Sequence, residues 1–302
     1  MRISSTQLST FADCPVKWFR QYVAGEQGNF GRAASIGSLF HSIIEFRIMH
    51  GYEPTRSMLC KLKGNYDDPR DHLRRYPTAW EPALEMARHI EDPMSYIPAD
   101  YELVGVEVCL DDLGVEIEPG VLCGGYFDLL ARNADGTEYW IGDWKTRGKA
   151  SWKKRPSTDE DFAENIQFTY YAAALTQAFP SVEKVHVTHI NVLRPADGGP
   201  AVKEDGATFT RLFLESVWTD LKHGVVASMI QMVEAGEQPD PPTDTSPCWK
   251  YGRCPHLRAC TARRQDIMFG VEDEADSGGG FFESFNTDKP KNIGFFGSFN
   301  GE

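Results

Sequence analysis

Gly124-Gly125-Tyr126-Phe127-Asp128 and Ile141-Gly142-Asp143-Trp144-Lys145 are the two segments that decide the fold of this chain. They belong to two apolar-rich stretches, residues 121–132 and 138–144, which we expect to be β-strands. Between the stretches lies Asn133-Ala134-Asp135-Gly136, whose Asp-Gly pair favours a hairpin turn. Alternate residues of a strand share one face, so Asp143 and Lys145 point the same way, and the hairpin can bring Asp128 beside them.

Two carboxylates and a lysine arranged in this way are suited to metal-assisted chemistry. Two aspartates and a backbone carbonyl form a hard oxygen site for Mg²⁺ or Mn²⁺, and a nearby lysine can stabilise developing charge. A lone Asp-x-Lys often occurs by chance, and its ordinary interpretation is a surface salt bridge on a solvated strand. Other features of the sequence therefore decide between the two interpretations.

Two helical segments supply such features. His41 ends Gly37-Ser38-Leu39-Phe40-His41, with Glu45 one turn later on the same face, and a histidine nitrogen can complete a Mn²⁺ site. Gln167 and Tyr171 also share one helical face. A histidine satisfied in the core, and ordinary helix packing, are the alternatives.

A basic stretch follows the second strand. Its cations are interleaved with Trp144 and Trp152, a composition that grips single-stranded nucleic acid through phosphates and bases. The alternative is a solvated loop. The basic residues are Lys145, Arg147, Lys149, Lys153, Lys154 and Arg155.

The sequence of the whole chain predicts helices, then strands, then helix, strand and helix. We expect helices over residues 4–23 (capped by Ser5) and 35–50, a helical insertion over 52–100, and a strand over 103–110. A helix over 159–178, a strand over 185–193 and a helix over 210–235 complete the pattern. The fold class is α/β, with a short mixed sheet flanked by helices.

Composition sets the compartment and limits the partners. The 302-residue chain has no apolar signal-peptide core and no run near the ~18 apolar residues of a membrane span, so we expect a cytoplasmic protein without a membrane partner. The net charge of −13 means that any DNA site must be a local basic patch.

The seven cysteines divide into two groups. Cys60, Cys109 and Cys123 are scattered, and we assign them to packing. Cys248, Cys254 and Cys260 cluster near the end, and Cys14 lies near the start. Four thiolates can hold a [4Fe–4S] cluster or one Zn²⁺, and the absence of close Cys-x2-4-Cys pairs makes zinc the weaker alternative. Free thiols are the third alternative.

Residues 271–302 differ in texture from the rest. They are acidic and glycine-containing, and they repeat Phe281-Phe282-Glu283-Ser284-Phe285-Asn286 as Phe295-Phe296-Gly297-Ser298-Phe299-Asn300. We expect a flexible tail that docks a protein partner through two copies. A neutral tail or a strand pair packed on the body is the alternative.

The order Gly37-x-x-x-His41, Asp128, Asp143-x-Lys145, Gln167-x-x-x-Tyr171 resembles that of RecB-like nucleases of the PD-(D/E)XK superfamily, over residues 1–265. The resemblance implies a restriction-endonuclease-like core. It also implies that His41, Asp128 and Asp143 are metal ligands and that Lys145 is the catalytic lysine. Gln167 and Tyr171 would contact DNA or support the site.

Two positions complete or depart from that pattern. The family often has a further glutamate ligand on the preceding strand, and Glu107 is the matching residue. Phe127 stands where the superfamily's name has a proline.

The cysteines resemble those of the CRISPR-associated RecB-like exonucleases and the AddB nuclease domain. There, one N-terminal and three C-terminal cysteines hold an iron–sulfur cluster that staples the two ends of the nuclease. The resemblance implies the same for Cys14, Cys248, Cys254 and Cys260, although the usual close first pair is absent here.

We therefore expect a Mg²⁺- or Mn²⁺-dependent DNA exonuclease that favours single-stranded ends, acting in replication, recombination or repair. The alternative is a catalytically quiet iron–sulfur DNA-binding or assembly subunit with the same fold. Intact Asp128, Asp143 and Lys145 argue against that alternative. No Gly-x4-Gly-Lys-[Ser/Thr] motif is present, so the sequence predicts no ATP-driven motor.

Overall fold

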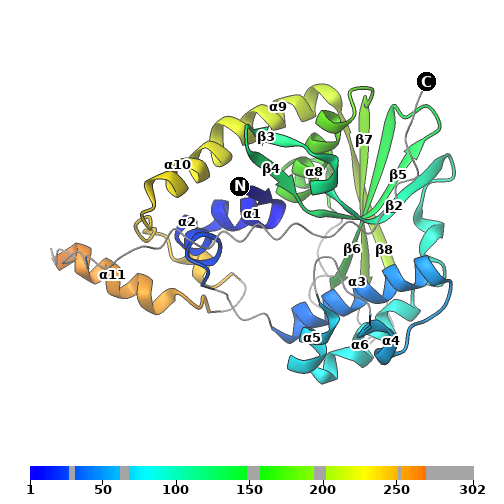
Figure 1. Ribbon diagram of the computed structural model, residues 1–302, viewed down its shortest axis with the longest axis horizontal. Helices are drawn as coiled ribbons and strands as arrows, with labels where there is room; N and C mark the ends of the chain where they lie inside the picture. Colours follow the sequence, from blue (N-terminus) through cyan, green and yellow to red (C-terminus); the bar gives the residue numbers. More distant parts are fainter. Residues whose placement is uncertain (27–30, 62–67, 148–156, 194–201, 251–252, 270–302) are drawn as a thin grey trace.

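The centre of the protein is a mixed five-stranded sheet (Figure 1). The computed structural model describes residues 1–26, 31–61, 68–147, 157–193, 202–250 and 253–269. The strand order is β2-β5-β6-β7-β8, with β6 and β7 parallel and the other neighbours antiparallel. The strands are β2 (Tyr101–Cys109), β5 (Tyr126–Asn133), β6 (Glu138–Arg147), β7 (Lys184–Leu193) and β8 (Val202–Thr210). The predicted α/β fold with a short mixed sheet is confirmed.

The hairpin between β5 and β6 forms where the Asp-Gly turn predicts it. The side chain of Asp135 accepts hydrogen bonds from the backbone amide and hydroxyl of Thr137, which closes the turn. Leu129 then pairs with Gly142 and Leu130 with Ile141. This register brings Asp128 next to the end of β6 that carries Asp143.

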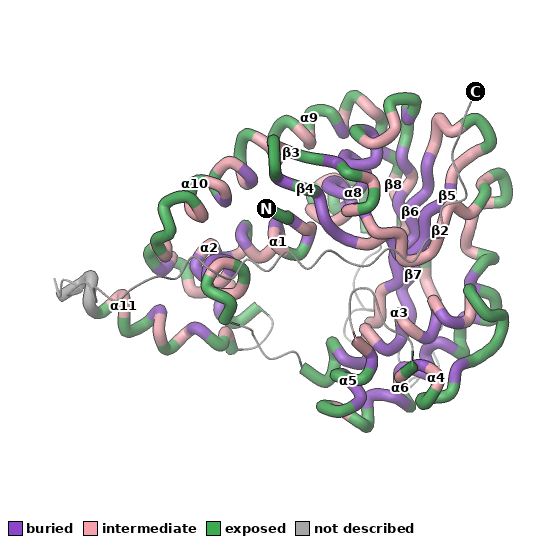
Figure 2. The backbone as a smooth tube through the Cα atoms, in the orientation of Figure 1, coloured by how far each residue is buried: buried purple, intermediate pink, exposed green. Residues whose placement is uncertain are grey.

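The sheet separates two hydrophobic cores (Figure 2). Tyr139 and Ile141 of β6 face the core that contains α8 (Ile166–Ala178), whereas Trp140 and Trp144 face the core that contains α3 (Arg32–His50). The period-two alternation of β6 thus sends Asp143 and Lys145 to the side of α8.

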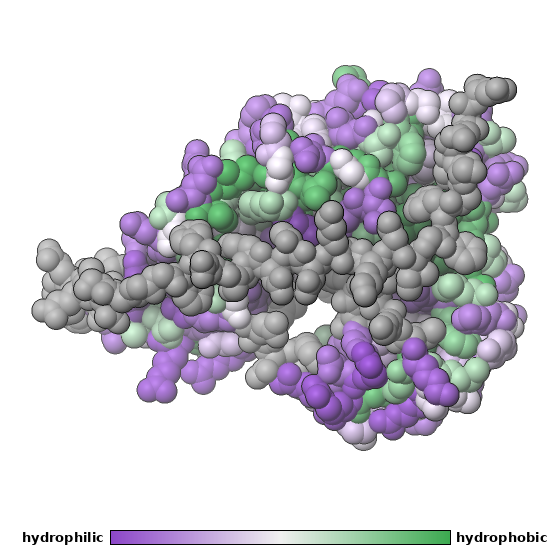
Figure 3. Space-filling view, in the orientation of Figure 1, coloured by the Kyte–Doolittle hydropathy of each residue, from purple (hydrophilic) through white to green (hydrophobic). Residues whose placement is uncertain are grey.

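Short helices lie beneath α3 in the range predicted as a helical insertion. They are α4 (Arg56–Leu59), α5 (Pro69–Arg75) and α6 (Trp80–Arg88), with 3₁₀ turns at Pro77–Ala79 and Pro93–Tyr96. Their buried side chains, such as Leu73 and Met86, pack into the α3 core. Hydrophilic side chains gather on the outer surface over α5 (Figure 3).

The predicted helix over residues 4–23 is wrong at its middle. It divides into α1 (Ser5–Asp13), α2 (Pro15–Trp18) and a π-helical turn (Phe19–Val23), because Cys14, which precedes a proline, is extended. The cap is the side chain of Ser4, which accepts from the amide of Gln7, and not that of Ser5.

The predicted strand over residues 121–132 is also divided. Gly125, with φ +145°, separates β4 (Val121–Gly124) from β5, and a Cβ there would lie 2.5 Å from the Tyr171 hydroxyl oxygen. A side chain at this position is therefore excluded by both backbone conformation and space. β4 belongs to a second sheet with β1 (Arg2–Ser4) and β3 (Glu116–Glu118).

The remaining helices are shorter than predicted or were not predicted. Residues 159–178 form α7 (Asp159–Ala163) and α8, separated by Asn165, whose side chain caps α8. Residues 210–235 form α9 (Arg211–Leu221), a π-helical turn (Lys222–Val226) and α10 (Ala227–Ala235). The chain continues into α11 (Leu257–Phe269). No helix in the described part of the chain is long and apolar enough to span a bilayer.

Candidate active site

A cavity of about 570 Å³ opens where α3, β2, β5 and β6 meet the first residues of α1 and α8. It brings together most of the residues that the sequence singled out. Its polar lining includes His41, Glu45, Glu107, Asp128, Asp143, Lys145, Gln167 and Tyr171.

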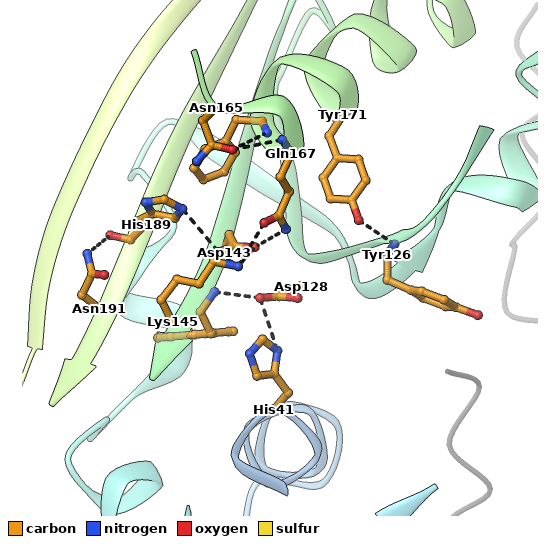
Figure 4. Close-up of polar contacts among 12 residues, drawn as sticks. His41, Tyr126, Asp128, Asp143, Lys145, Asn165, Gln167, Tyr171, His189 and Asn191 are labelled. Atoms are coloured by element: carbon orange, nitrogen blue, oxygen red, sulfur yellow. Dashed lines mark hydrogen bonds and ion pairs between the residues drawn. The ribbon is translucent and has the colours of Figure 1, made fainter. Parts of the chain in front are cut away.

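Three of these side chains form a group of potential metal ligands. One ligand atom each from His41, Glu107 and Asp128 lies within 4.8 Å of the others. The Nδ1 atom of His41 is 3.4 Å from Oδ2 of Asp128 and 3.8 Å from Oε1 of Glu107 (Figure 4 for the Asp128 contact). Two carboxylates and an imidazole are a donor set that suits Mn²⁺ and Mg²⁺.

Glu107 reaches this group through an unusual backbone conformation. It has φ +47°, in the left-handed region, and it lies between the residue pairs Val106–Leu129 and Val108–Phe127 of the β2–β5 ladder. A residue other than glycine in this conformation costs about 1–2 kcal/mol. The local irregularity turns the carboxylate of an edge strand toward Asp128.

Asp143 and Lys145 form an ion pair beside these potential ligands, and Gln167 forms hydrogen bonds with both residues. Nζ of Lys145 lies 3.0 Å from Oδ1 and 2.7 Å from Oδ2 of Asp143. Gln167 bridges the pair, because its Oε1 accepts from Lys145 at 3.1 Å and its Nε2 donates to Asp143 Oδ1 at 2.8 Å. Asp128 is held separately by the backbone amide of Trp144, which donates to Oδ2 at 2.7 Å.

Burial and the neighbouring charges shift the pKa values of these groups in different directions. Burial opposes the charge of Asp128, but His41 and Lys145 hold the pKa of Asp128 below its usual value. Burial raises the pKa of Glu107, and the charge of Asp128 adds to the rise. Despite burial, Asp128 and Glu107 raise the pKa of His41 well above its usual value. The site thus concentrates negative charge that a cation would neutralise.

Glu45 adds a further carboxylate to the cavity. Burial, reinforced by the charge of Glu107, raises the pKa of Glu45 to about 7. The sequence placed Glu45 on the face of His41, and the structure brings both to the cavity.

The sequence also predicts DNA-contacting or site-supporting roles for Tyr171, Gln167 and Arg147, and the structure shows what each of them contacts. The Tyr171 hydroxyl accepts from the amide of Tyr126 at 3.4 Å and is buried, and Gln167 bonds Asp143. Nε of Arg147 donates to Asn191 at 2.9 Å. Lys149, Lys153 and Lys154 lie outside the described residues.

His189 was not anticipated. It pairs with Asp143 across β6 and β7, and its Nε2 lies 3.8 Å from Oδ2 of Asp143 (Figure 4). The sequence feature that could have indicated His189 is its position in the alternating pattern of β7, where it follows Val185 and Val187 on the same face of the strand. Burial, with the nearby charges of Lys145 and Arg147, lowers the pKa of His189 to about 3.

The four cysteines near the chain ends gather around α2 and α11. Cys14 and Cys260 pack around Val16, and the amide of Cys254 donates to the carbonyl of Cys248 at 2.8 Å. Burial and the neighbouring Cys254 and Cys14 raise the pKa of the Cys248 thiol. Within the described residues, no three of the four sulfurs lie within 4.8 Å of one another.

The fold and this cavity define a class of hydrolytic enzymes in which carboxylates and a lysine meet on a β-hairpin. The family model of the PD-(D/E)XK nuclease superfamily matches residues 2–261, and the chain belongs to this superfamily.

Solved structures agree on the fold. The chain is similar to a crystal structure from Eubacterium rectale named "Putative exonuclease", with a TM-score of 0.51 and 13% identity over 86% of this chain and 87% of that one. No curated protein gave a match.

Proposed function

We propose that this protein is a Mg²⁺- or Mn²⁺-dependent DNA exonuclease that hydrolyses phosphodiester bonds and favours single-stranded ends. The observation that carries the proposal is the convergence of His41, Glu107, Asp128, Asp143 and Lys145 on one cavity. Membership of the nuclease superfamily supports the reaction class, and the name of the similar structure supports the exonuclease mode.

The donor set fits a divalent cation. His41, Glu107 and Asp128 would hold it, with Asp143 beside them. Burial raises the pKa of both Glu107 and Asp143, and the charge of the neighbouring Asp128 adds to each rise. When bound, the cation would stabilise charge on a phosphoryl oxygen and acidify water.

Lys145 contributes a positive charge to the wall of the cavity. Its Nζ is held by Asp143 and Gln167 at the wall of the cavity, so a phosphate oxygen that enters meets a fixed ammonium group. A donor fixed in advance stabilises developing charge without reorganisation. Lys145 thus stabilises the transition state more than the bound substrate.

The preference for single strands rests on the sequence at the end of β6 and after it. Arg147 ends β6, and Lys149, Lys153 and Lys154 follow it, together with Trp152. Phosphate contacts and ring stacking together favour unpaired strands. Roles in replication, recombination or repair would follow from such a substrate.

The test is cleavage of single strands labelled at the 5′ or 3′ end, with Mg²⁺ or Mn²⁺ and with EDTA. Asp143→Ala and Lys145→Ala should abolish cleavage while DNA binding persists, and Lys184→Ala, a surface lysine on β7, should cleave normally. Full activity of Asp143→Ala, prepared free of other nucleases, would overturn the proposal.

We also propose that Cys14, Cys248, Cys254 and Cys260 hold a [4Fe–4S] cluster. Four thiols from the two ends of the domain meet in one place. The absence of close Cys-x2-4-Cys pairs in the sequence makes zinc the weaker alternative.

The surroundings of the cysteines fit an electron-rich group. Among the described residues, Nε of Arg20, Nε2 of His256 and Nε of Arg264 are buried without a hydrogen-bond partner. The charge of Arg20 acts on the Cys260 thiol and that of Arg264 on Cys248. Buried donors without acceptors are costly, and thiolate or sulfide sulfur would accept from them.

Anaerobic purification tests the cluster. The protein should be brown, with broad absorbance near ~400 nm and iron in the preparation. Cys14→Ser should lose the colour, whereas Cys60→Ser, which changes a cysteine elsewhere, should keep it. Stoichiometric zinc without iron would support the zinc alternative.

The Phe-rich tail, residues 271–302, lies outside the described residues, and its docking role remains a proposal from the sequence. A chain that ends at Phe269 should keep activity on a bare oligonucleotide and should lose a protein partner in a pull-down. Loss of activity or folding would instead assign the tail to the nuclease body.

A further inference from the structure

His189 faces the proposed catalytic centre from the strand behind it. In the parallel pairing of β6 and β7, Asp143 lies opposite His189 and Lys145 lies opposite Asn191. The side chains of both β7 residues point to the same side of the sheet as Asp143 and Lys145. β7 therefore supplies a second row of polar groups behind the catalytic strand (Figure 4).

Two orphaned polar atoms meet at this point. Within the described part of the chain, neither Nε2 of His189 nor Oδ2 of Asp143 has a hydrogen-bond partner, and 3.8 Å separates them. Oδ2 also lies 2.7 Å from Lys145 Nζ, an ionic contact without hydrogen-bond geometry. The gap of 3.8 Å leaves no room for a bridging water, so any bond that forms between the two atoms is direct.

The histidine ring cannot move away from Asp143. Only 8% of the residue is exposed, and the ring packs against Phe162 and Phe168, with centroids 5.4 and 4.5 Å away. A short approach of the Asp143 carboxylate, by about 1 Å, would therefore complete the hydrogen bond. The partner that moves is the carboxylate, because Phe162 and Phe168 hold the ring in place.

We propose that His189 is a positioning residue for Asp143, whose Nε2–H donates to Oδ2 and holds the carboxylate in its cation-binding orientation. The proposal rests on the proposed function, since it requires Asp143 to serve a catalytic cation. Asp143 would then have a neutral donor at each oxygen, Gln167 at Oδ1 and His189 at Oδ2, with Lys145 close to both oxygens.

A neutral donor suits this place better than a cation. Lys145 already supplies one positive charge to Asp143, and a second would compete with a divalent ion for the same carboxylate. A neutral imidazole would orient Asp143 while leaving its negative charge for the cation.

Three variants of the full chain separate positioning from packing. His189→Phe keeps a ring against Phe162 and Phe168 but removes the donor. His189→Gln places an amide nitrogen where Nε2 lies, and His189→Asn places it short of Asp143. Each is assayed below its melting temperature for Mn²⁺ affinity by calorimetry and for kcat on a single-stranded oligonucleotide.

We expect His189→Phe and His189→Asn to lose about 10–100-fold in Mn²⁺ affinity or kcat, as changes behind a metal ligand typically do. His189→Gln should stay within about threefold of the wild type. The Gln and Asn variants lose similar packing, so their ratio reports the donor even if both are less stable.

Equal Mn²⁺ affinity and kcat in the Gln and Asn variants would overturn the role of His189. So would unchanged values in His189→Phe. Failure of the proposed function looks different: the wild type would bind no Mn²⁺, or Asp143→Ala would bind it equally well.

Discussion

Gln167 offers a change that tests the site without disturbing the fold. Its amide connects Lys145 and Asp143 through bonds of 3.1 and 2.8 Å, both to charged groups. Each such bond contributes about 1.5–3 kcal/mol. Lys145 and Asp143 keep their own ion pair when the amide is removed, so we expect Gln167→Ala to raise the barrier by about 2 kcal/mol, or to lower kcat about 30-fold.

The stability of the Gln167→Ala variant should change little. The α8 cap is made by Asn165, whose side chain accepts from the backbone amide of residue 167, and alanine keeps that amide. Gln177→Ala, at an exposed position on the same helix, is the matched control and should be fully active. Gln167→Glu has nearly the same volume but turns an acceptor toward Asp143, so it should lose at least as much activity.

The assay is kcat on a labelled oligonucleotide together with melting temperature for the three variants. Wild-type kcat in Gln167→Ala would refute the idea that Gln167 positions the catalytic pair. A fall in melting temperature large enough to account for the lost activity would refute it equally.

Other changes test the fold and the cysteines. Tyr170→Phe removes a buried hydroxyl that donates to Ile3 and accepts from Gly124, so it should cost about 2 kcal/mol and lower the melting temperature by about 5 °C, whereas Tyr22→Phe should not. Lys184, His186 and Tyr101 lower the pKa of Glu138 to about 2, below its unfolded value near 4.5. The stability that Glu138 contributes is therefore present above pH ~4.5 and is lost as the pH falls toward 2. Glu138→Gln should be about 1 kcal/mol less stable at pH 7, and urea titrations should show the difference vanishing near pH 2; a constant difference would contradict this. Cys248→Ser should lose iron and melt several degrees lower, while Cys123→Ser should keep its iron; equal iron in both would contradict the staple.

The β5–β6 hairpin could be predicted from the sequence because its signals are local. Asn133–Gly136 defines the turn, and the period of two places Asp143 and Lys145 on one face. His41 and Asp128 were expected near them and line the same cavity. Glu107 was expected only from the resemblance. Its φ of +47° depends on pairing with β5, which no local pattern of β2 specifies.

Elements whose structure depends on tertiary contacts were harder to predict from the sequence. β8 contains Lys203, Glu204, Asp205 and Gly206, residues of low strand propensity, and pairing along β7 determines its structure. The break at Gly125 depends on space taken by Tyr171, which comes from a distant helix. A lone histidine among apolar residues usually belongs to the core, so the place of His189 in the alternation of β7 did not by itself indicate a function.

The central claim is that Asp128 and its neighbours form a cation-dependent phosphodiesterase centre. Its most direct test is single-turnover cleavage of a 5′-labelled single strand by wild type and Asp128→Asn, with enzyme in excess and Mn²⁺ saturating. Asparagine keeps the volume and can still accept from the Trp144 amide, so only the charge facing His41 is lost. We predict a rate at least ~10³-fold lower, corresponding to about 4 kcal/mol of lost transition-state stabilisation. A rate within threefold of the wild type would contradict the assignment of this cavity as the active site.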